Sequence, residues 1–280
     1  MAADGYYIYN GTGVIPAGVT RVRIHESVTV ISADAFCENP NIEELECHHR
    51  VKKVGREAFY NCPSLRRVRM PGVEVVEGWA FANCYALTIV ECSKLERIEE
   101  SAFEGCEFLR SINLSSAKIV KDGAFSNCAA LTNIKFGDKL ERIEQRAFVD
   151  CTSLERITLP LKDGMITDDD TFQGCKKLVH VDLVEGEVLR DTIDALLLEE
   201  WRNDMKDNLD AINQSLPTAR AGGFLSSAGV WDAGEKAQAV QLWIRSVLHK
   251  IIHYKAQHQC SLNKAATTLQ LDLPNDIPSE

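Results

Sequence analysis

The fold of this chain is decided by the stretch Ala58-Phe59-Tyr60-Asn61-Cys62-Pro63-Ser64-Leu65-Arg66-Arg67-Val68-Arg69-Met70. Its apolar skeleton is Ala-Phe, then Cys, Leu and Val at steps of three residues, and Met two residues later. The skeleton recurs at intervals of 22 to 24 residues, and its phenylalanines are Phe36, Phe59, Phe81, Phe103, Phe125, Phe148 and Phe172. A fixed period of this length is typical of stacked supersecondary units, so the chain is predicted to form a solenoid.

Each repeat is predicted to contribute one short parallel strand, because the pattern Leu-x-x-Ile-x-Leu follows every Phe-x-x-Cys. The pattern begins one period earlier, at Val19, and ends near Leu183. This gives about eight rungs, and a stack of parallel strands roughly 35–40 Å long. A second apolar pair in each repeat, such as Val51 and Val54, is expected to form the opposite wall.

One cysteine slot of the repeat is filled six times in succession, by Cys62, Cys84, Cys106, Cys128, Cys151 and Cys175. The chain has ten cysteines, and none is spaced Cys-x-x-Cys as in a zinc or redox site. Cysteine behaves as a compact hydrophobic residue in a core. We therefore expect a structural ladder of free thiols beside the phenylalanine ladder, in a reducing compartment.

The pattern I-x-x-x-A-F-x-x-C-x-x-L-x-x-I-x-L resembles the BspA-like, Treponema pallidum-type leucine-rich repeat over about residues 19–184. The whole chain is similar to uncharacterised BspA-like proteins of diatoms that carry a helical tail. The resemblance implies a leucine-rich repeat solenoid used for protein contacts, and it brings no catalytic residue or cofactor. Two departures are Asn39 in a cysteine slot and Gly164 in a leucine slot, which suit outer repeats.

The outward positions of the strands form a candidate partner-binding face. Its residues are Arg21, Arg23, Glu44, Glu46, Arg67, Arg69, Ile89, Glu91, Ser111, Asn113, Asn133 and Lys135. Charges alternate in sign over the first four rungs, so one interpretation is cross-rung ion pairing alone, at under about 1 kcal/mol for each exposed pair. The other interpretation is a binding face whose less charged centre is Ile89, Ser111 and Asn133.

Both ends of the repeat region are expected to be capped. Residues 1–18 combine a Tyr-rich segment with the turn signal Asn10-Gly11-Thr12-Gly13, which predicts an N-terminal hairpin cap. The solenoid is assigned to residues 19–187. A helical period then predicts a C-terminal region over 188–280, with helices at about 189–215, 234–258 and 262–271 and a linker at 217–233.

Composition and motifs exclude several function classes. The net charge of −10 argues against nucleic-acid binding, and no apolar run is long enough to span a membrane. The triplet Asp168-Asp169-Asp170 lacks the spacing of a calcium loop, and His249 and His253 lie opposite the apolar face of their predicted helix. We see no enzyme signature and expect no metal site or cofactor. Stoichiometric zinc in the purified protein would revive an enzyme or metal-protein function.

The function predicted is a non-catalytic scaffold that binds a protein partner through the strand face, with the helical tail capping the last repeat. One alternative is an adaptor whose C-terminal helices make the contact, and another is a cell-surface adhesin-like protein. Because the N-terminus has no basic and apolar leader, we expect an intracellular, cytoplasmic protein. A monomer is expected, without nucleic-acid or membrane partners.

Overall fold

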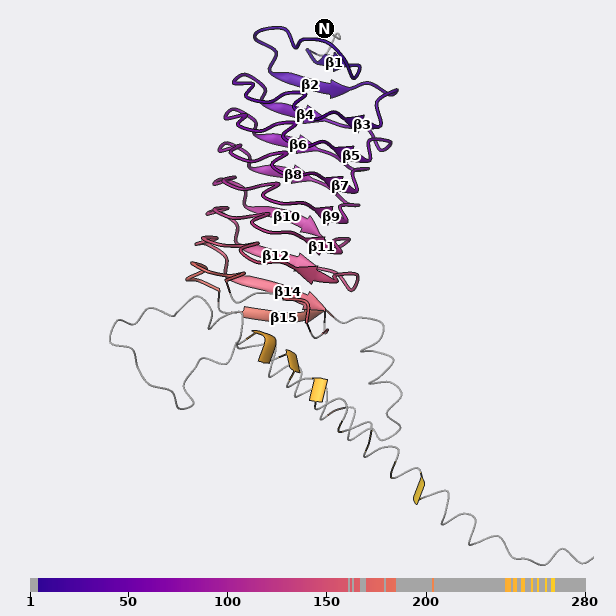
Figure 1. The fold of residues 1–280 in the computed structure, drawn as a ribbon, viewed down its shortest axis with the longest axis vertical. Helices are drawn as coiled ribbons and strands as arrows, with labels where there is room; N and C mark the ends of the chain where they lie inside the picture. Colours follow the sequence, from indigo (N-terminus) through magenta and orange to yellow (C-terminus); the bar gives the residue numbers. More distant parts are fainter. Residues whose placement is uncertain are drawn as a thin grey trace, which may run out of the picture.

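The computed structural model describes residues 5–160, 162, 164–166, 170–178 and 180–184, with residues 203, 240–242, 244, 245, 248, 249, 253, 256, 260, 263 and 264 further along. Over the repeats the chain winds into stacked coils (Figure 1). Each of six consecutive coils contributes one strand to each of two parallel sheets. The parallel-strand solenoid predicted from the repeat period is thus confirmed.

The larger sheet, called the wide sheet, has nine parallel strands in the order β1-β2-β4-β6-β8-β10-β12-β14-β15. The last eight are the eight rungs predicted from the sequence. The strands are β1 (Tyr7–Tyr9), β2 (Arg21–Ile24), β4 (Glu44–Glu46), β6 (Arg67–Arg69), β8 (Ile89–Glu91), β10 (Ser111–Leu114), β12 (Asn133–Phe136), β14 (Arg156–Pro160) and β15 (His180–Val184).

The smaller sheet, called the narrow sheet, is the predicted opposite wall, and its order is β13-β11-β9-β7-β5-β3. Val54 of this sheet is fully buried, as is Val51 just before it. Its two-residue strands are β3 (Val30–Ile31), β5 (Lys53–Val54), β7 (Val75–Val76), β9 (Arg97–Ile98), β11 (Ile119–Val120) and β13 (Arg142–Ile143).

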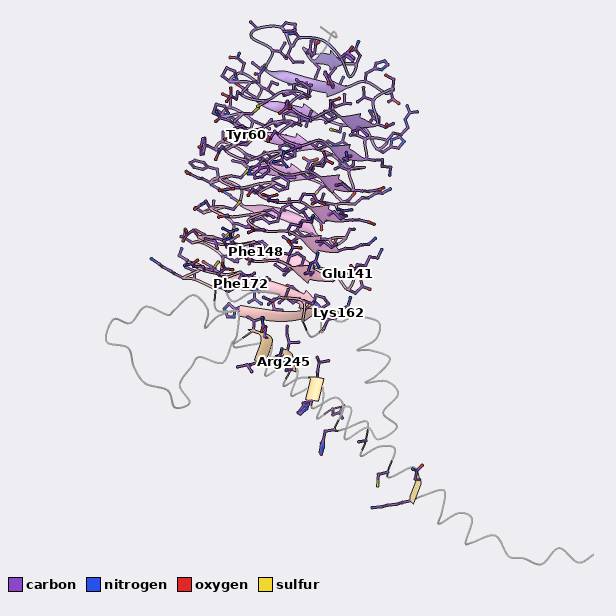
Figure 2. All side chains as sticks on the ribbon, in the orientation of Figure 1. Tyr60, Glu141, Phe148, Lys162, Phe172 and Arg245 are labelled. Atoms are coloured by element: carbon purple, nitrogen blue, oxygen red, sulfur yellow. The ribbon has the colours of Figure 1, made fainter. Side chains whose placement is uncertain are left out.

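The core between the sheets is built from ladders of identical residues. Neighbouring phenylalanine rings from Phe36 to Phe172 stack nearly parallel, with centroids 4.7–5.8 Å apart. Figure 2 labels Phe148 and Phe172, the last pair of this stack. Beside them, each ladder cysteine donates its Sγ–H to the carbonyl of the phenylalanine one coil earlier, as from Cys106 to Phe81 at 3.2 Å. Both predicted ladders are therefore in the core.

The turns that hold Phe36 to Phe148 each contain two residues with left-handed backbone, and the turn of Phe172 contains one, Gly174. One slot lies two residues before the phenylalanine and includes Glu57, Trp79 and Ser101. The other slot lies two residues after it and includes Asn61, Gly105 and Asp150. Asn, Asp and Gly tolerate positive φ best, which explains why the second slot is restricted to small or amide side chains in most repeats.

The N-terminal hairpin predicted for residues 1–18 is wrong. Strand β1 pairs with β2 in parallel, with Tyr7 opposite Val22, whereas a hairpin would make the two strands antiparallel. Gly11 and Gly13 do adopt positive φ, but the chain continues around a shortened coil. The register offset is 15 residues here, from Tyr7 to Val22, against 23 from Arg21 to Glu44.

The last repeat departs from the pattern, but the assignment of Gly164 to its leucine slot is wrong. Gly164 is exposed, and the buried apolar residues are Met165 and Ile166. Ile166 continues the narrow sheet only as an isolated bridge to Ile143. Thr171 replaces the ladder alanine and is buried, with its hydroxyl donating to the carbonyl of Glu144 at 3.4 Å.

Beyond β15 the described residues are scattered. Those between 240 and 256 are helical, and Val240 and Ile244 belong to the buried core cluster. The predicted linker at 217–233 lies outside the described residues, as does nearly all of the predicted helix at 189–215. The helical organisation of residues 188–280 as a whole stays a prediction.

Candidate functional site

The candidate face occupies one side of the wide sheet, as the strand register requires. One exposed column runs through Arg21, Glu44, Arg67, Ile89 and Ser111, each opposite the next. A second runs through Arg23, Glu46, Arg69 and Glu91, and Asn113 pairs with Lys135 further along. All twelve predicted face residues are therefore on one surface; that they bind a partner stays a prediction.

The N-terminal part of this face is an ion-pair lattice, as one of the two interpretations required. Arg21 contacts Glu44 at 2.9 Å, and Arg23 contacts Glu46 at 2.9 Å. Arg69 lies between two carboxylates, 3.0 Å from Glu46 and 3.6 Å from Glu91. Arg67 is also paired with Glu91. These charges satisfy one another, so this part of the face offers little unneutralised charge.

Tyr6 completes the lattice, and the sequence analysis missed it. The guanidinium carbons of Arg21 and Arg23 both lie 4.2 Å from the centre of its ring. Its hydroxyl accepts from Arg21 Nη2 at 2.9 Å and donates to Glu44 Oε2 at 3.1 Å. The hydrogen bond from Arg21 lowers the pKa of Glu44, and the same bond raises the pKa of Arg21.

The centre of the face has a different character. Ile89 is 44% exposed at the point where the column of charges ends. The next residues in that column, Ser111 and Asn133, are exposed and uncharged. The sequence analysis assigned these three residues to the less charged centre of a binding face, and that role stays a prediction.

Two exposed aromatic residues lie beside this centre. Tyr85 is 41% exposed and Phe108 is 56% exposed, in the turns that lead into β8 and β10. The sequence analysis missed both. A signal existed, because Phe108 occupies a slot that is Ser64, Ala86, Ala130 and Ser153 in neighbouring repeats. A large apolar side chain in a small, solvent-facing slot is not required by the core.

Three exposed cations border the centre: Arg66, Arg110 and Lys135. None of their side chains has an ion pair or hydrogen bond within the described part of the chain. Arg66 and Arg110 each lie between a buried leucine and the first residue of a strand, and they flank Thr88 in the intervening coil. These cations contrast with the arginines of the N-terminal lattice, which are engaged by glutamates.

The ladder of the wide sheet is shorter at this centre than on either side. Strand β8 pairs with β6 over three residues and β12 pairs with β14 over three, but β10 pairs with β8 and with β12 over two residues each. Beyond this point Cys92 donates its Sγ–H to the carbonyl of Asn113 at 3.4 Å. Val90, Cys92 and Ile112 are 6–7% exposed, whereas most of the core has no exposed surface.

The narrow sheet also has an ion-paired exterior. Lys52 is paired with Glu74, and Lys118 with Glu96 at 2.7 Å. Lys121 contacts Glu99 at 2.6 Å in the turn that follows the sheet. Val30, at one edge, is the exposed large apolar residue of this sheet. Within the described residues the narrow sheet therefore lacks a cluster of exposed apolar side chains like that at the centre of the wide sheet.

The ladder cysteines are not suited to thiolate chemistry. Burial raises the pKa of the Cys62 thiol to about 12, and that of Cys92 to about 11. The thiolate is the nucleophile and the metal ligand, so these thiols stay protonated and inert near neutral pH. Within the described residues, no three His, Cys, Asp or Glu side chains are grouped to hold a metal ion.

The residues considered for cations or metals are placed as follows. Asp170 Oδ1 accepts a hydrogen bond from the backbone N–H of Arg146 at 3.1 Å, while Asp168 and Asp169 lie outside the described residues. His249 and His253 are exposed. In the part of the chain that the structure describes, no helix has the length and hydrophobicity needed to cross a membrane.

Comparison with known proteins identifies a repeat family. The family described as "BspA type Leucine rich repeat region" matches residues 17–119 and 96–191, in six copies. No curated protein matches the chain.

Three leucine-rich repeat proteins are among the similar solved structures. A leucine-rich repeat protein of Bacteroides ovatus is 23% identical with a TM-score of 0.38, and the match covers 62% of this chain and 57% of that one. The T. pallidum leucine-rich repeat protein is 20% identical with a TM-score of 0.39, covering 64% and 83%. A leucine-rich cell surface protein of Faecalibacterium prausnitzii is 17% identical with a TM-score of 0.31, covering 67% and 89%.

Proposed function

Because the chain belongs to the BspA-type leucine-rich repeat family, whose members generally mediate protein–protein interaction or adhesion, we propose that it is a non-catalytic scaffold. It binds a protein partner through the outward positions of the wide sheet. It acts as a monomer and has no nucleic-acid or membrane partner.

The observation that carries this proposal is the change in character along the wide sheet. The N-terminal rungs neutralise their own charges, as in the Arg23–Glu46 pair, while Ile89 is exposed among uncharged neighbours. Interfaces commonly place charged residues at the rim and fewer at the core. A face with this gradient suits a partner that covers the centre and stops at the ion-paired rungs.

A helical segment that caps the last coil is part of the same proposal. Val240 is fully buried and Ile244 is 3% exposed, one helical turn apart, so both face the core. Gln241 Nε2 donates to the carbonyl of Ile166 at 3.0 Å, which satisfies a backbone group of the irregular last repeat. A solenoid needs such a cap because its terminal repeat otherwise exposes an apolar surface. We also propose that the chain resembles diatom proteins that carry a helical tail.

The proposed location is the reducing interior of the cell. Its support is that all ten cysteines are free and that the six ladder thiols serve as hydrogen-bond donors inside the core. Oxidation of the ladder thiols would remove the Sγ–H donors and with them these hydrogen bonds. A cell-surface, adhesin-like role is the alternative, and surface labelling of intact cells with a membrane-impermeant biotin reagent separates the two.

The binding surface is tested with a photo-activated cross-linker placed on each sheet. The residue p-benzoylphenylalanine replaces Asn133 on the wide sheet in one variant and Val30 on the narrow sheet in the other, since both positions are exposed. We expect an extract to give a discrete cross-linked partner from position 133 and none from position 30. Cross-linking from position 30 alone, or from neither, would contradict the proposal.

One specific observation favours an adaptor function for the C-terminal segment instead. Leu242 is 63% exposed on the same helical segment that buries Val240. Truncation after Val184 distinguishes the two functions. If the truncated protein aggregates, the segment is a cap; if it stays monodisperse and loses its cross-linked partner, the segment is the contact surface.

A further inference from the structure

We infer that the partner docks on the central patch of the wide sheet, defined as Tyr85, Ile89, Phe108, Arg66, Arg110 and Lys135, through an acidic segment that carries apolar side chains. This inference rests on the proposed function and adds the location and the chemistry of the contact.

The apolar part of the central patch comes from two neighbouring coils. Ile89 pairs with Ser111, so β8 and β10 are adjacent, about 4.8 Å apart. Tyr85 precedes Ile89 by four residues, and Phe108 precedes Ser111 by three. Along each coil, at most roughly 13 Å of chain separates the turn residue from its strand. The three apolar side chains therefore lie on two adjacent coils, close to the start of their strands. Of the six large hydrophobic side chains exposed in the described structure, these three lie in β8 or in the turns that lead into the adjacent strands β8 and β10.

The width of the sheet explains why the turn residues belong to the contact. Most strands are three or four residues long, a width of about 10–13 Å, and only alternate residues of each strand face solvent. The eight rungs extend for roughly 35–40 Å. The strand face alone thus offers a few hundred Å², whereas a stable interface takes about 800 Å² from each partner. A partner must also cover the adjoining turns, where Tyr85 and Phe108 are exposed.

The charge of the surface around the central patch indicates which kind of partner it binds. In the coils of β6, β8, β10 and β12, three positions face solvent. They are the residue just before the strand and the first and third residues of the strand. These twelve positions contain five cations and one carboxylate, at Arg66, Arg67, Arg69, Arg110, Lys135 and Glu91. The net charge of this area is therefore +4, although the whole protein carries −10. A partner that complements it is acidic, since potentials at interfaces are complementary.

The cations of the central patch are available to such a partner. Arg67 and Arg69 are already paired with Glu91, but Arg66, Arg110 and Lys135 have no side-chain partner among the described residues. One carboxylate, Glu107, is exposed in the turn beside Phe108. A second exposed carboxylate, Glu43, lies one coil before Arg66. Three available cations against these two carboxylates leave a small positive surplus around the apolar side chains.

The test uses peptides as probes of this chemistry with the full chain. A short fluorescein-labelled peptide alternates glutamate with leucine and tryptophan. Matched peptides replace every glutamate with glutamine or with lysine, and labelled oligothymidine stands for nucleic acid. Fluorescence anisotropy should show the acidic peptide binding at least about tenfold more tightly than the other three probes, with an affinity that falls as salt is added.

Two variant pairs locate the binding. The Ile89→Ser/Phe108→Ser variant removes apolar contacts, and Arg66→Gln/Arg110→Gln removes charge; each should weaken acidic-peptide binding by about tenfold or more. Their controls are Val30→Ser on the narrow sheet and Lys176→Gln/Lys177→Gln in the last turn, which should bind as the unaltered chain does. All of these side chains are exposed, so folding is checked by an unchanged thermal melt.

Several outcomes would overturn the inference. They are equal binding of the glutamine or lysine peptide, tighter binding of oligothymidine, equal losses in the control variants, or no saturable binding by about 1 mM peptide. A partner cross-linked from position 133 that binds the Ile89→Ser/Phe108→Ser variant unchanged would leave the proposed function standing while the central patch fails.

Discussion

The ring of Phe103 lies parallel to the ring of Phe125, with 5.3 Å between centroids and 1° between planes. Each ring therefore occupies the same environment one coil apart, with a further ring on either side. This repetition makes the core continuous from coil to coil and gives the central phenylalanines the largest expected effect on stability.

Replacing Phe103 with alanine should lower the free energy of unfolding by about 3–5 kcal/mol, because it empties a fully buried position in the middle of the stack. Urea unfolding followed by circular dichroism measures the change. Phe108→Ala is the matched control, and since Phe108 is 56% exposed, its loss should be within about 0.5 kcal/mol. A loss under about 1 kcal/mol for Phe103→Ala would contradict the stacked core.

Replacing Ser101 with glycine should stabilise the protein by about 0.5–1 kcal/mol, although it removes a side chain. Ser101 has a φ of 51°, where glycine is favoured, and the next coil already has Gly123 in the same slot. Ser111→Gly is the control, because Ser111 lies in a strand, and that change should destabilise. If both changes destabilise equally in thermal melts, left-handed backbone does not limit the Ser101 slot.

Alkaline pH should destabilise the fold through the buried thiols. Burial raises the pKa of Cys62 to about 12 from an ordinary value of 9.0. Its contribution to stability is therefore fully present below pH 9 and is lost as pH rises toward 12, because the unfolded chain ionises first.

The Cys62 contribution can be isolated by comparing the unaltered chain with Cys62→Ala. Between pH 9 and 10 the free energy of unfolding of the unaltered chain should fall more steeply, by up to about 1.4 kcal/mol per pH unit for one such group. Urea unfolding at several pH values gives both slopes. Identical slopes would show that Cys62 is not shielded from water in the folded state.

Replacing Tyr6 with alanine should destabilise the first coils by about 1 kcal/mol, since its ring contacts two guanidinium groups. Tyr6→Phe keeps the ring and loses only the hydroxyl that bridges Arg21 and Glu44, so its effect should be smaller. Hydrogen exchange of β1 and β2 amides measures the effect locally. Equal losses for both variants would assign the stabilisation to the hydroxyl.

Much of the fold could be predicted because a solenoid repeats one environment. Phe103, Cys106 and Leu109 meet the same neighbours in every coil, so their period reveals the ladders, the parallel strands and the outward columns. The restriction of one turn slot to residues such as Asn61 and Gly105 was also visible, although its cause, left-handed backbone, required the structure.

The sequence by itself determined the coil, its buried ladders and the side of the sheet on which Arg67 and Ile89 lie, because these follow from local periodicity. Only the tertiary structure decided which of the residues that depart from the repeat pattern lie next to one another. It placed β1 parallel to β2, brought Tyr6 onto Arg21 and Arg23, and set Phe108 one coil from Tyr85 and Ile89. The physical reason is that these arrangements join residues of neighbouring coils, at positions where the repeats differ and no periodic constraint applies.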